Sequence, residues 1–235
     1  MATAPPLVRH LDIAVLRDVQ LGALEAQPEA LLEYLRSVRP ATLVLTGEIA
    51  KSSVFGGGRL STATLRVVLR LGELAAEGTR IYLIAEQEPA WLPANRNLLH
   101  RNVSVRKTLL LHQGGEKFYF GREHAKSSVL SRVRSWIDGQ QTATTVPTQP
   151  LSARVQLGHR LATHHNCTTC VLLDNQDAMS ELHTEQQQRT RIVAPASWTQ
   201  TQTSLELRFG EWSHRNEAVE STLLRRIVAA GPTVH

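Results

Sequence analysis

The chain has 235 residues, of which 42% are hydrophobic and 20% are charged, as is usual for a single globular domain. No apolar run approaches the roughly 20 residues of a membrane-spanning helix, and residues 1–9 lack the apolar core of a signal peptide. We therefore expect the protein in the cytoplasm. The net charge of +5 is spread along the chain, and a dispersed excess of this size does not favour nucleic acid as a partner.

The first third of the chain alternates apolar runs with amphipathic segments. Buried strands are expected over Leu11–Leu16, Thr42–Leu45 and Arg80–Ala85. One helix is expected to begin near Pro28, and another at Ser61 or Thr62. The second helix is expected to turn one set of residues toward the core: Leu65, Val68, Leu69 and Gly72.

This β-α-β-α-β order with short links predicts a parallel sheet covered by helices. In such sheets the functional loops follow the carboxyl ends of the strands. Here those loops carry Asp18, Glu48 and the run from Glu86 to Glu88. Carboxylate oxygens gathered at one sheet edge are candidate ligands for a hard divalent cation.

The second half of the chain is richer in strand patterns. A β-hairpin is predicted at Gln113-Gly114-Gly115, between strands expected over Val103–Leu111 and Lys117–Phe120. A basic helix is expected over residues 126–137, followed by a polar linker over residues 138–150. A helix over residues 152–166 then leads to the last strands, expected over Thr169–Leu173, Met179–Thr184, Arg191–Ala194 and Ser204–Phe209.

Three segments together resemble the opening of the calcineurin-like metallophosphoesterases. They are Asp18-Val19-Gln20-Leu21-Gly22, Leu43-Val44-Leu45-Thr46-Gly47-Glu48-Ile49 and Gly78-Thr79-Arg80-Ile81-Tyr82-Leu83. The branch that the chain resembles most is the UDP-2,3-diacylglucosamine pyrophosphohydrolases, whose later turns look like Ala194–Thr199 and Gly210-Glu211-Trp212. The resemblance implies one domain over residues 1–235, built as an α/β sandwich of two mixed sheets flanked by helices. It also implies a site where two divalent metals polarise a phosphate and activate a water.

The same resemblance identifies the metal ligands that this chain lacks. Asp18 matches the family's first Asp, whereas Gln20 stands in place of its His and Glu48 in place of its second Asp. The family's Asn and His at the third strand end, and its His-containing loop after the strand ending at Leu173, are also replaced. The full set of vestigial ligand positions is Asp18, Gln20, Glu48, Gln87, Glu88, Asp174 and Gln176.

Loss of nearly every imidazole ligand predicts a pseudoenzyme with no catalytic residues, resident metal or cofactor. Such a protein is expected to act by binding a protein partner or a phosphate-bearing ligand. The alternative is a divergent metal-dependent phosphohydrolase, acting on a phosphodiester or on a UDP-2,3-diacylglucosamine-like diphosphate. It would hold Mn²⁺ or Mg²⁺ through oxygen atoms of Asp18, Glu48 and Asp174.

The remaining motifs have simpler interpretations. The family's long lid is reduced here to residues 123–157, in which the basic helix 126–137 offers a peripheral membrane contact or an ordinary solvated face. The run from His164 to Cys170 invites a zinc interpretation, but Cys170 lies on an apolar strand and is better read as a small buried hydrophobe. The identity of the partner and the existence of a homo-oligomer stay open.

Overall fold

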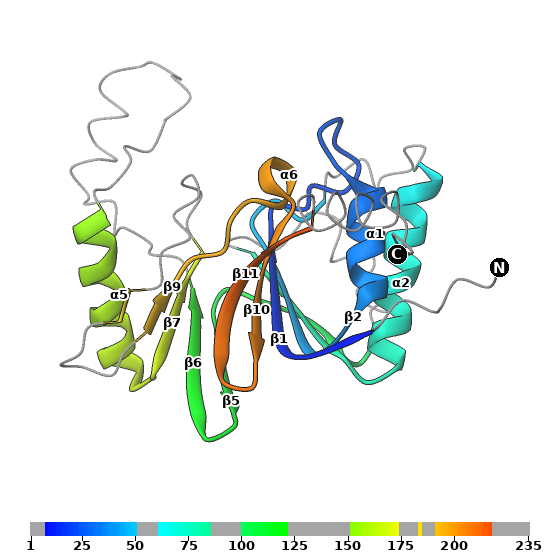
Figure 1. The fold of residues 1–235 in the computed structure, drawn as a ribbon. Helices are drawn as coiled ribbons and strands as arrows, with labels where there is room; N and C mark the ends of the chain where they lie inside the picture. The colour runs from blue at the N-terminus through cyan, green and yellow to red at the C-terminus, as the bar shows by residue number, and fades with distance from the viewer. Residues whose placement is uncertain are drawn as a thin grey trace, which may run out of the picture.

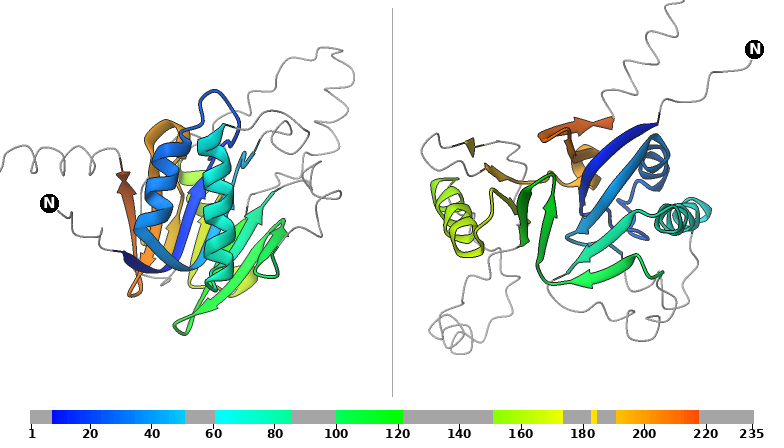
Figure 2. Two further views of the ribbon diagram at one scale, coloured as in Figure 1. Left: turned by 90° about the vertical axis from the view of Figure 1, so that its right-hand side faces the viewer. Right: turned by 90° about the horizontal axis from the view of Figure 1, so that it is seen from below.

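In the computed structural model, two β-sheets pack face to face and carry helices on their outer faces (Figure 1). The structure describes residues 8–50, 61–85, 100–121, 151–173, 183–184 and 191–217. The end-on view in Figure 2 shows α1 (Pro28–Ser37) and α2 (Thr62–Ala76) against one sheet and α5 (Leu151–His165) against the other. No helix among the described residues is long and apolar enough to cross a membrane.

The first sheet has six strands in the order β11-β10-β1-β2-β3-β4. They are β1 (Arg9–Arg17), β2 (Val38–Thr46), β3 (Arg80–Ile84), β4 (Val103–Arg106), β10 (Thr203–Arg208) and β11 (Glu211–Asn216). Strands β1 to β4 are parallel, whereas β10 is antiparallel to both β1 and β11. The predicted β-α-β-α-β order is confirmed, and the carboxyl ends of β1, β2 and β3 meet at one edge of this sheet.

The second sheet has five strands in the order β5-β6-β7-β9-β8. They are β5 (Leu109–Gln113), β6 (Glu116–Gly121), β7 (Thr169–Leu172), β8 (His183–Thr184) and β9 (Arg191–Val193). The predicted hairpin is confirmed, with Gly114 and Gly115 at φ of 60° and 81° between β5 and β6.

The prediction of one strand over Val103–Leu111 is wrong. The run divides at Lys107, so that β4 pairs with β3 in the first sheet and β5 pairs with β6 in the second. Both halves are apolar enough to read as one strand, but Leu109 and Leu111 pack between the sheets while β4 extends an edge. The chain therefore crosses from one sheet to the other inside a continuous extended pattern.

Helix α2 begins as predicted but presents a different face to the core. The Ser61 hydroxyl accepts a 3.0 Å hydrogen bond from the Thr64 amide, as an N-cap should. Of the expected inward residues, Val68 packs against the core, whereas Leu65 and Leu69 are 46% and 58% exposed and Gly72 is exposed. The buried face is instead built on Thr64, Val67, Arg70 and Leu74, since the Arg70 guanidinium bonds the Leu35 carbonyl of α1 and the carboxylates of Glu73 and Glu77.

Apolar side chains fill three layers that follow the alternation of each strand. Between the sheets, Ile13 and Val15 of β1 pack in one cluster with Phe118, Phe120 and Val171. The opposite face of the first sheet is covered by α1 and α2, and the outer face of the second sheet by α5. This helix–sheet–sheet–helix arrangement is the expected α/β sandwich of two mixed sheets flanked by helices.

Candidate functional site

The loops that leave β1 and β2 are tied together by backbone hydrogen bonds. The Asp18 amide donates to the Thr46 carbonyl, and the Gln20 amide donates to the Glu48 carbonyl, both at 2.9 Å. These bonds extend the parallel strand pairing beyond Arg17 and Thr46. The first three predicted site positions, Asp18, Gln20 and Glu48, therefore lie together at the carboxyl edge of the sheet.

Both oxygens of the Asp18 carboxylate contact the protein itself. Oδ1 accepts a 2.9 Å hydrogen bond from the Glu48 amide. Oδ2 lies 3.0 Å from Nε of Arg17, an ion pair rather than a linear hydrogen bond. The Asp18 carboxylate can approach the second loop this closely because residue 47 is a glycine, with φ of 73°. A Cβ at that position would lie 1.9 Å from Oδ1. Asp18 thus holds the second loop in place from the end of the first.

Arg17 brings a positive charge to this edge. Its side chain is only 3% exposed, and strand alternation places it on the same face as Ile13 and Val15, between the sheets. Its register partner Thr46 shares that face with Val44. The Thr46 hydroxyl is buried and has no hydrogen-bond partner among the described residues. A guanidinium and a hydroxyl therefore lie buried between the sheets at this edge.

A third loop reaches the same edge from the second sheet. Ser197 forms a parallel bridge with Arg17, and Trp198 begins the short helix α6 (Trp198–Thr201). The Trp198 ring is fully buried and packs 5.4 Å from the ring of Tyr34 on α1. The Gln27 side-chain amide donates to the Thr199 carbonyl at 3.0 Å. The turn that resembled the family's C-terminal motif is thus anchored beside the end of β1.

The other predicted site positions lie outside the described residues: Gln87, Glu88, Asp174 and Gln176. The same holds for the basic helix 126–137 and for residues 123–150 of the expected lid, while residues 151–157 begin α5. Within the part of the chain that the structure describes, no group of three or more His, Cys, Asp or Glu side chains is placed to hold a metal. The roles assigned to all seven vestigial positions stay predictions.

The His164-to-Cys170 run forms a packed outer layer rather than a ligand cage. Cys167 and Cys170 are free thiols, both buried in the cluster between α5 and the second sheet. The prediction that Cys170 points into a core is confirmed. His165 stacks on Tyr119 with ring centroids 4.3 Å apart and on His164 at 4.7 Å. Burial lowers the pKa of His165, and His164 lowers it further.

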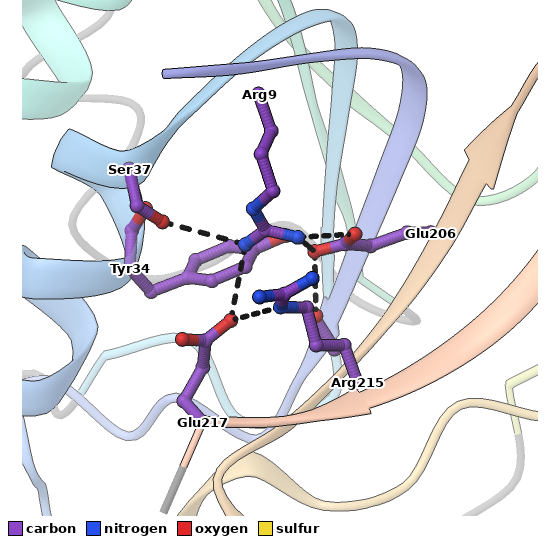
Figure 3. Close-up of polar contacts among 7 residues, drawn as sticks. Arg9, Tyr34, Ser37, Glu206, Arg215 and Glu217 are labelled. Carbon is purple, nitrogen blue, oxygen red and sulfur yellow. Dashed lines mark hydrogen bonds and ion pairs between the residues drawn. The ribbon is translucent and has the colours of Figure 1, made fainter. Parts of the chain in front are cut away.

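A second charged cluster lies at the other end of β1 (Figure 3). Arg9 donates to both carboxylate oxygens of Glu206, at 3.0 and 2.7 Å, and to Glu217 at 3.1 Å. Arg215 is ion-paired with Glu217 at 3.3 Å. Burial raises the pKa of Glu217, while Arg9 and Arg215 oppose that rise. Tyr34 and Ser37 of α1 close the cluster (Figure 3).

Sequence reasoning identified the carboxylates at the carboxyl edge but missed Arg17. A signal for it existed, because Arg17 continues the alternation of Ile13 and Val15 at the end of an apolar strand. A charged residue in such a position is either buried and paired or part of a site. The Arg9 cluster had no comparable signal, since its partners are about two hundred residues away.

No protein-family model and no curated protein matches the chain. Among solved structures, a novel archaeal phosphodiesterase is 7% identical with a TM-score of 0.46, covering 87% of this chain and 98% of that one. A predicted phosphoesterase of Streptococcus pneumoniae TIGR4 is 11% identical with a TM-score of 0.40, covering 88% and 89%. Wild-type Vps29 of Entamoeba histolytica, solved with zinc, is 12% identical with a TM-score of 0.41, covering 86% and 96%.

Proposed function

We propose that the chain is a metallophosphoesterase-like protein that no longer hydrolyses phosphate esters with two metals, and that acts by binding a protein partner or a phosphate-bearing ligand. The observation that carries this proposal is the state of Asp18, the one ligand position that keeps the family's residue. Both of its carboxylate oxygens are engaged, one by the Glu48 amide and one by the Arg17 guanidinium.

Electrostatics at this edge oppose a divalent cation. A metal bound to Oδ2 of Asp18 would lie within about 5 Å of the Arg17 guanidinium, and at an effective dielectric of about 20 the repulsion is on the order of 6 kcal/mol. Arg17 already supplies the positive charge that neutralises Asp18, at 3.0 Å. This repulsion supports the proposal that the edge no longer holds two metals.

The groups beside Asp18 are better suited to an anion. Arg17 presents a guanidinium, which binds phosphate and carboxylate oxygens through several N–H donors. Thr46 and Ser197 add hydroxyl groups on the strands and loop next to it. An oxyanion of a ligand, or a carboxylate of a protein partner, matches this set of donors in sign and chemistry.

The alternative is a phosphohydrolase that uses Mn²⁺ or Mg²⁺ at Asp18 and Glu48. One feature favours it: the Glu48 side chain is exposed at the same edge, within reach of solvent and substrate. In that case Asp18 would have to exchange its contact with Arg17 for a metal.

Two measurements on the purified chain test these functions. We expect elemental analysis to find less than one equivalent of Mn, Fe or Zn, and bis-p-nitrophenyl phosphate to stay intact with Mn²⁺ present. Metal-dependent turnover that disappears in Asp18→Asn would establish the phosphohydrolase and overturn the proposal. Turnover that Asp18→Asn leaves unchanged would exclude this metal arrangement and point to a contaminant. The matched control is Asp12→Asn, on the same strand but away from this edge.

A further inference from the structure

A groove of about 560 Å³ lies at the end of the first sheet opposite to Asp18. Its walls come from the amino-terminal ends of β1 and β2, the turn after α2 and the β10–β11 turn. A groove of this size suits a small organic ligand. Its polar lining includes Arg39 and Arg208, and Phe209 forms part of its rim.

Phe209 sits in a conformation that does not suit its side chain. Phe209 and Gly210, with φ of 53° and 80°, form the two-residue loop between Arg208 and Glu211. Positive φ at both positions defines a type I′ turn, which favours Asn-Gly or Gly-Gly. The β5–β6 hairpin has Gly114-Gly115 in the same turn. A bulky residue in the left-handed region is an outlier that points to a functional constraint.

The Phe209 ring is also held out into solvent. It is 85% exposed, so the fold gains little from burying it. The Arg208 guanidinium lies 4.8 Å from the ring centroid, over one face. The ring and the cation are therefore stacked on each other beside the groove. An exposed aromatic ring of this kind can bind a planar ring by stacking.

The acidic groups in the groove are already engaged by donors of the fold. Asp12 accepts from the Phe209 amide at 3.0 Å and from the Gln113 side chain at 3.4 Å. Glu77 is ion-paired with Arg39 at 2.8 Å and with Arg70 at 3.2 Å. Arg208 has no carboxylate partner among the described residues. The formal charges of the lining cancel, because Arg39 and Arg208 stand against Asp12 and Glu77, so the exposed Arg208 is the cation available to an anionic ligand among the described residues.

We propose that this groove binds a small planar aromatic ligand carrying an anionic group, such as an aryl phosphate or a nucleoside monophosphate. The ring stacks against Phe209, and the anion is bound by the Arg208 guanidinium. The site lies at the opposite end of the strands from Asp18, so it does not depend on the function proposed for that edge.

The test uses the residue preference of the type I′ turn between β10 and β11. Phe209→Asn removes the ring and creates the preferred Asn-Gly turn, so the variant should melt at the same temperature as the parent chain or higher. A loss of binding in this variant cannot then be ascribed to misfolding. The matched control is Leu24→Asn, which makes the same kind of change at a side chain that is 100% exposed elsewhere.

Binding is followed by amide chemical shifts of Phe209, Gly210, Gly78 and Ala41 during titration with phenyl phosphate and adenosine 5′-monophosphate. Inorganic phosphate, which has only the anionic group, and adenosine, which has only the aromatic ring, are titrated separately for comparison. We expect saturable shifts with Kd at least tenfold lower for one of the complete ligands than for either half. Phe209→Asn should raise Kd at least tenfold, Arg208→Gln should weaken the anionic ligands but not adenosine, and Leu24→Asn should change nothing.

Three results would overturn the site. One is the absence of saturable shifts with both complete ligands. A second is equal binding by Phe209→Asn, which would remove the ring from the interaction. A third is localisation of the shifts at Thr46 and Gly47, which would move the ligand to the Asp18 edge and support the proposed function instead. Preference for phenyl phosphate or for the nucleotide identifies which aromatic anion the groove accepts.

Discussion

The two ends of strand β1 each carry a largely buried arginine, and the two are held in different ways. Arg9 at the amino end donates to Glu206 and Glu217, which are 197 and 208 positions away in the sequence. Arg17 at the carboxyl end is ion-paired with Asp18, the next residue. One arginine joins the first strand to the last hairpin, whereas the other neutralises a carboxylate in a single loop.

This difference separates residues that hold the fold together from residues at the candidate site. At the amino end, two carboxylates and two guanidinium groups satisfy one another, and β10 and β11 are fixed to β1 (Figure 3). At the carboxyl end, the Arg17–Asp18 pair supports a loop geometry that also depends on Gly47. We therefore expect changes at Arg9 to act on global stability and changes at Arg17 to act on ligands of the edge.

The largest effect is expected for Arg9→Met. This change leaves Glu206 and Glu217, whose side chains are 5% and 20% exposed, without their shared cation. Removing one member of such a cluster costs about 3 kcal/mol or more of unfolding free energy. Chemical denaturation measures it. Arg39→Met is the matched control, because the Arg39–Glu77 pair is 34% and 42% exposed and should cost less than about 1 kcal/mol. Equal losses in the two variants would contradict the structural role of Arg9.

The next effect is expected for Gly47→Ala. The new Cβ would meet Oδ1 of Asp18 at 1.9 Å and Cγ at 2.8 Å, so either the loop or the carboxylate must move. Gly115→Ala is a close control, because its φ of 81° is similar but nothing lies within 4 Å of the added carbon. The control should lose about 1 kcal/mol from backbone strain alone. Gly47→Ala should lose about 1 kcal/mol more than that, and a smaller loss than the control would show that Asp18 is not fixed by this contact.

A smaller effect is expected in the double-mutant cycle of Arg17→Gln and Asp18→Asn. Their interaction energy should be about 1 kcal/mol, since the pair is partly buried but not linear. Arg17→Gln should also raise the affinity for Mn²⁺, because it removes a positive charge beside Asp18. Isothermal titration with Mn²⁺ measures this, with Arg9→Lys as the control that keeps its charge. Unchanged Mn²⁺ affinity in Arg17→Gln would mean that Arg17 does not exclude cations.

The sequence predicted the features that depend on local pattern and chain order. Strand–helix alternation and the spacing of polar loops were enough to place Asp18 and Glu48 at one sheet edge, and the Gly114-Gly115 pair was enough to place a hairpin. The family resemblance supplied the second sheet, which local pattern alone did not.

The predictions that were wrong concern features that depend on tertiary contacts. The strand expected over Val103–Leu111 divides between two sheets, because both halves are extended and only packing decides where each one pairs. The face of α2 was wrong because Arg70, a charged residue, is buried by bonds to α1 and to Glu77. Hydrophobic periodicity cannot anticipate an arginine on the core side of a helix.

The smallest expected effect is a pH dependence at the Arg9 end of β1. Burial raises the pKa of Glu217 above its ordinary value of 4.5, with Glu206 adding to the rise and Arg9 and Arg215 opposing it. Just above that value the folded chain binds more protons at this site than the unfolded chain. Its contribution to stability is therefore complete below the unfolded pKa and declines as pH rises through the folded pKa.

Glu217→Gln removes this titration, so the stability of the parent relative to the variant should fall as pH rises from about 4 to about 7. Denaturation midpoints across that range measure the slope. Glu211→Gln is the matched control, because Glu211 lies exposed on the same strand and should give a flat difference. If the stability of the parent relative to Glu217→Gln instead rises with pH, the guanidinium groups of Arg9 and Arg215 outweigh burial in their effect on the pKa of Glu217. The cluster would then favour the charged carboxylate.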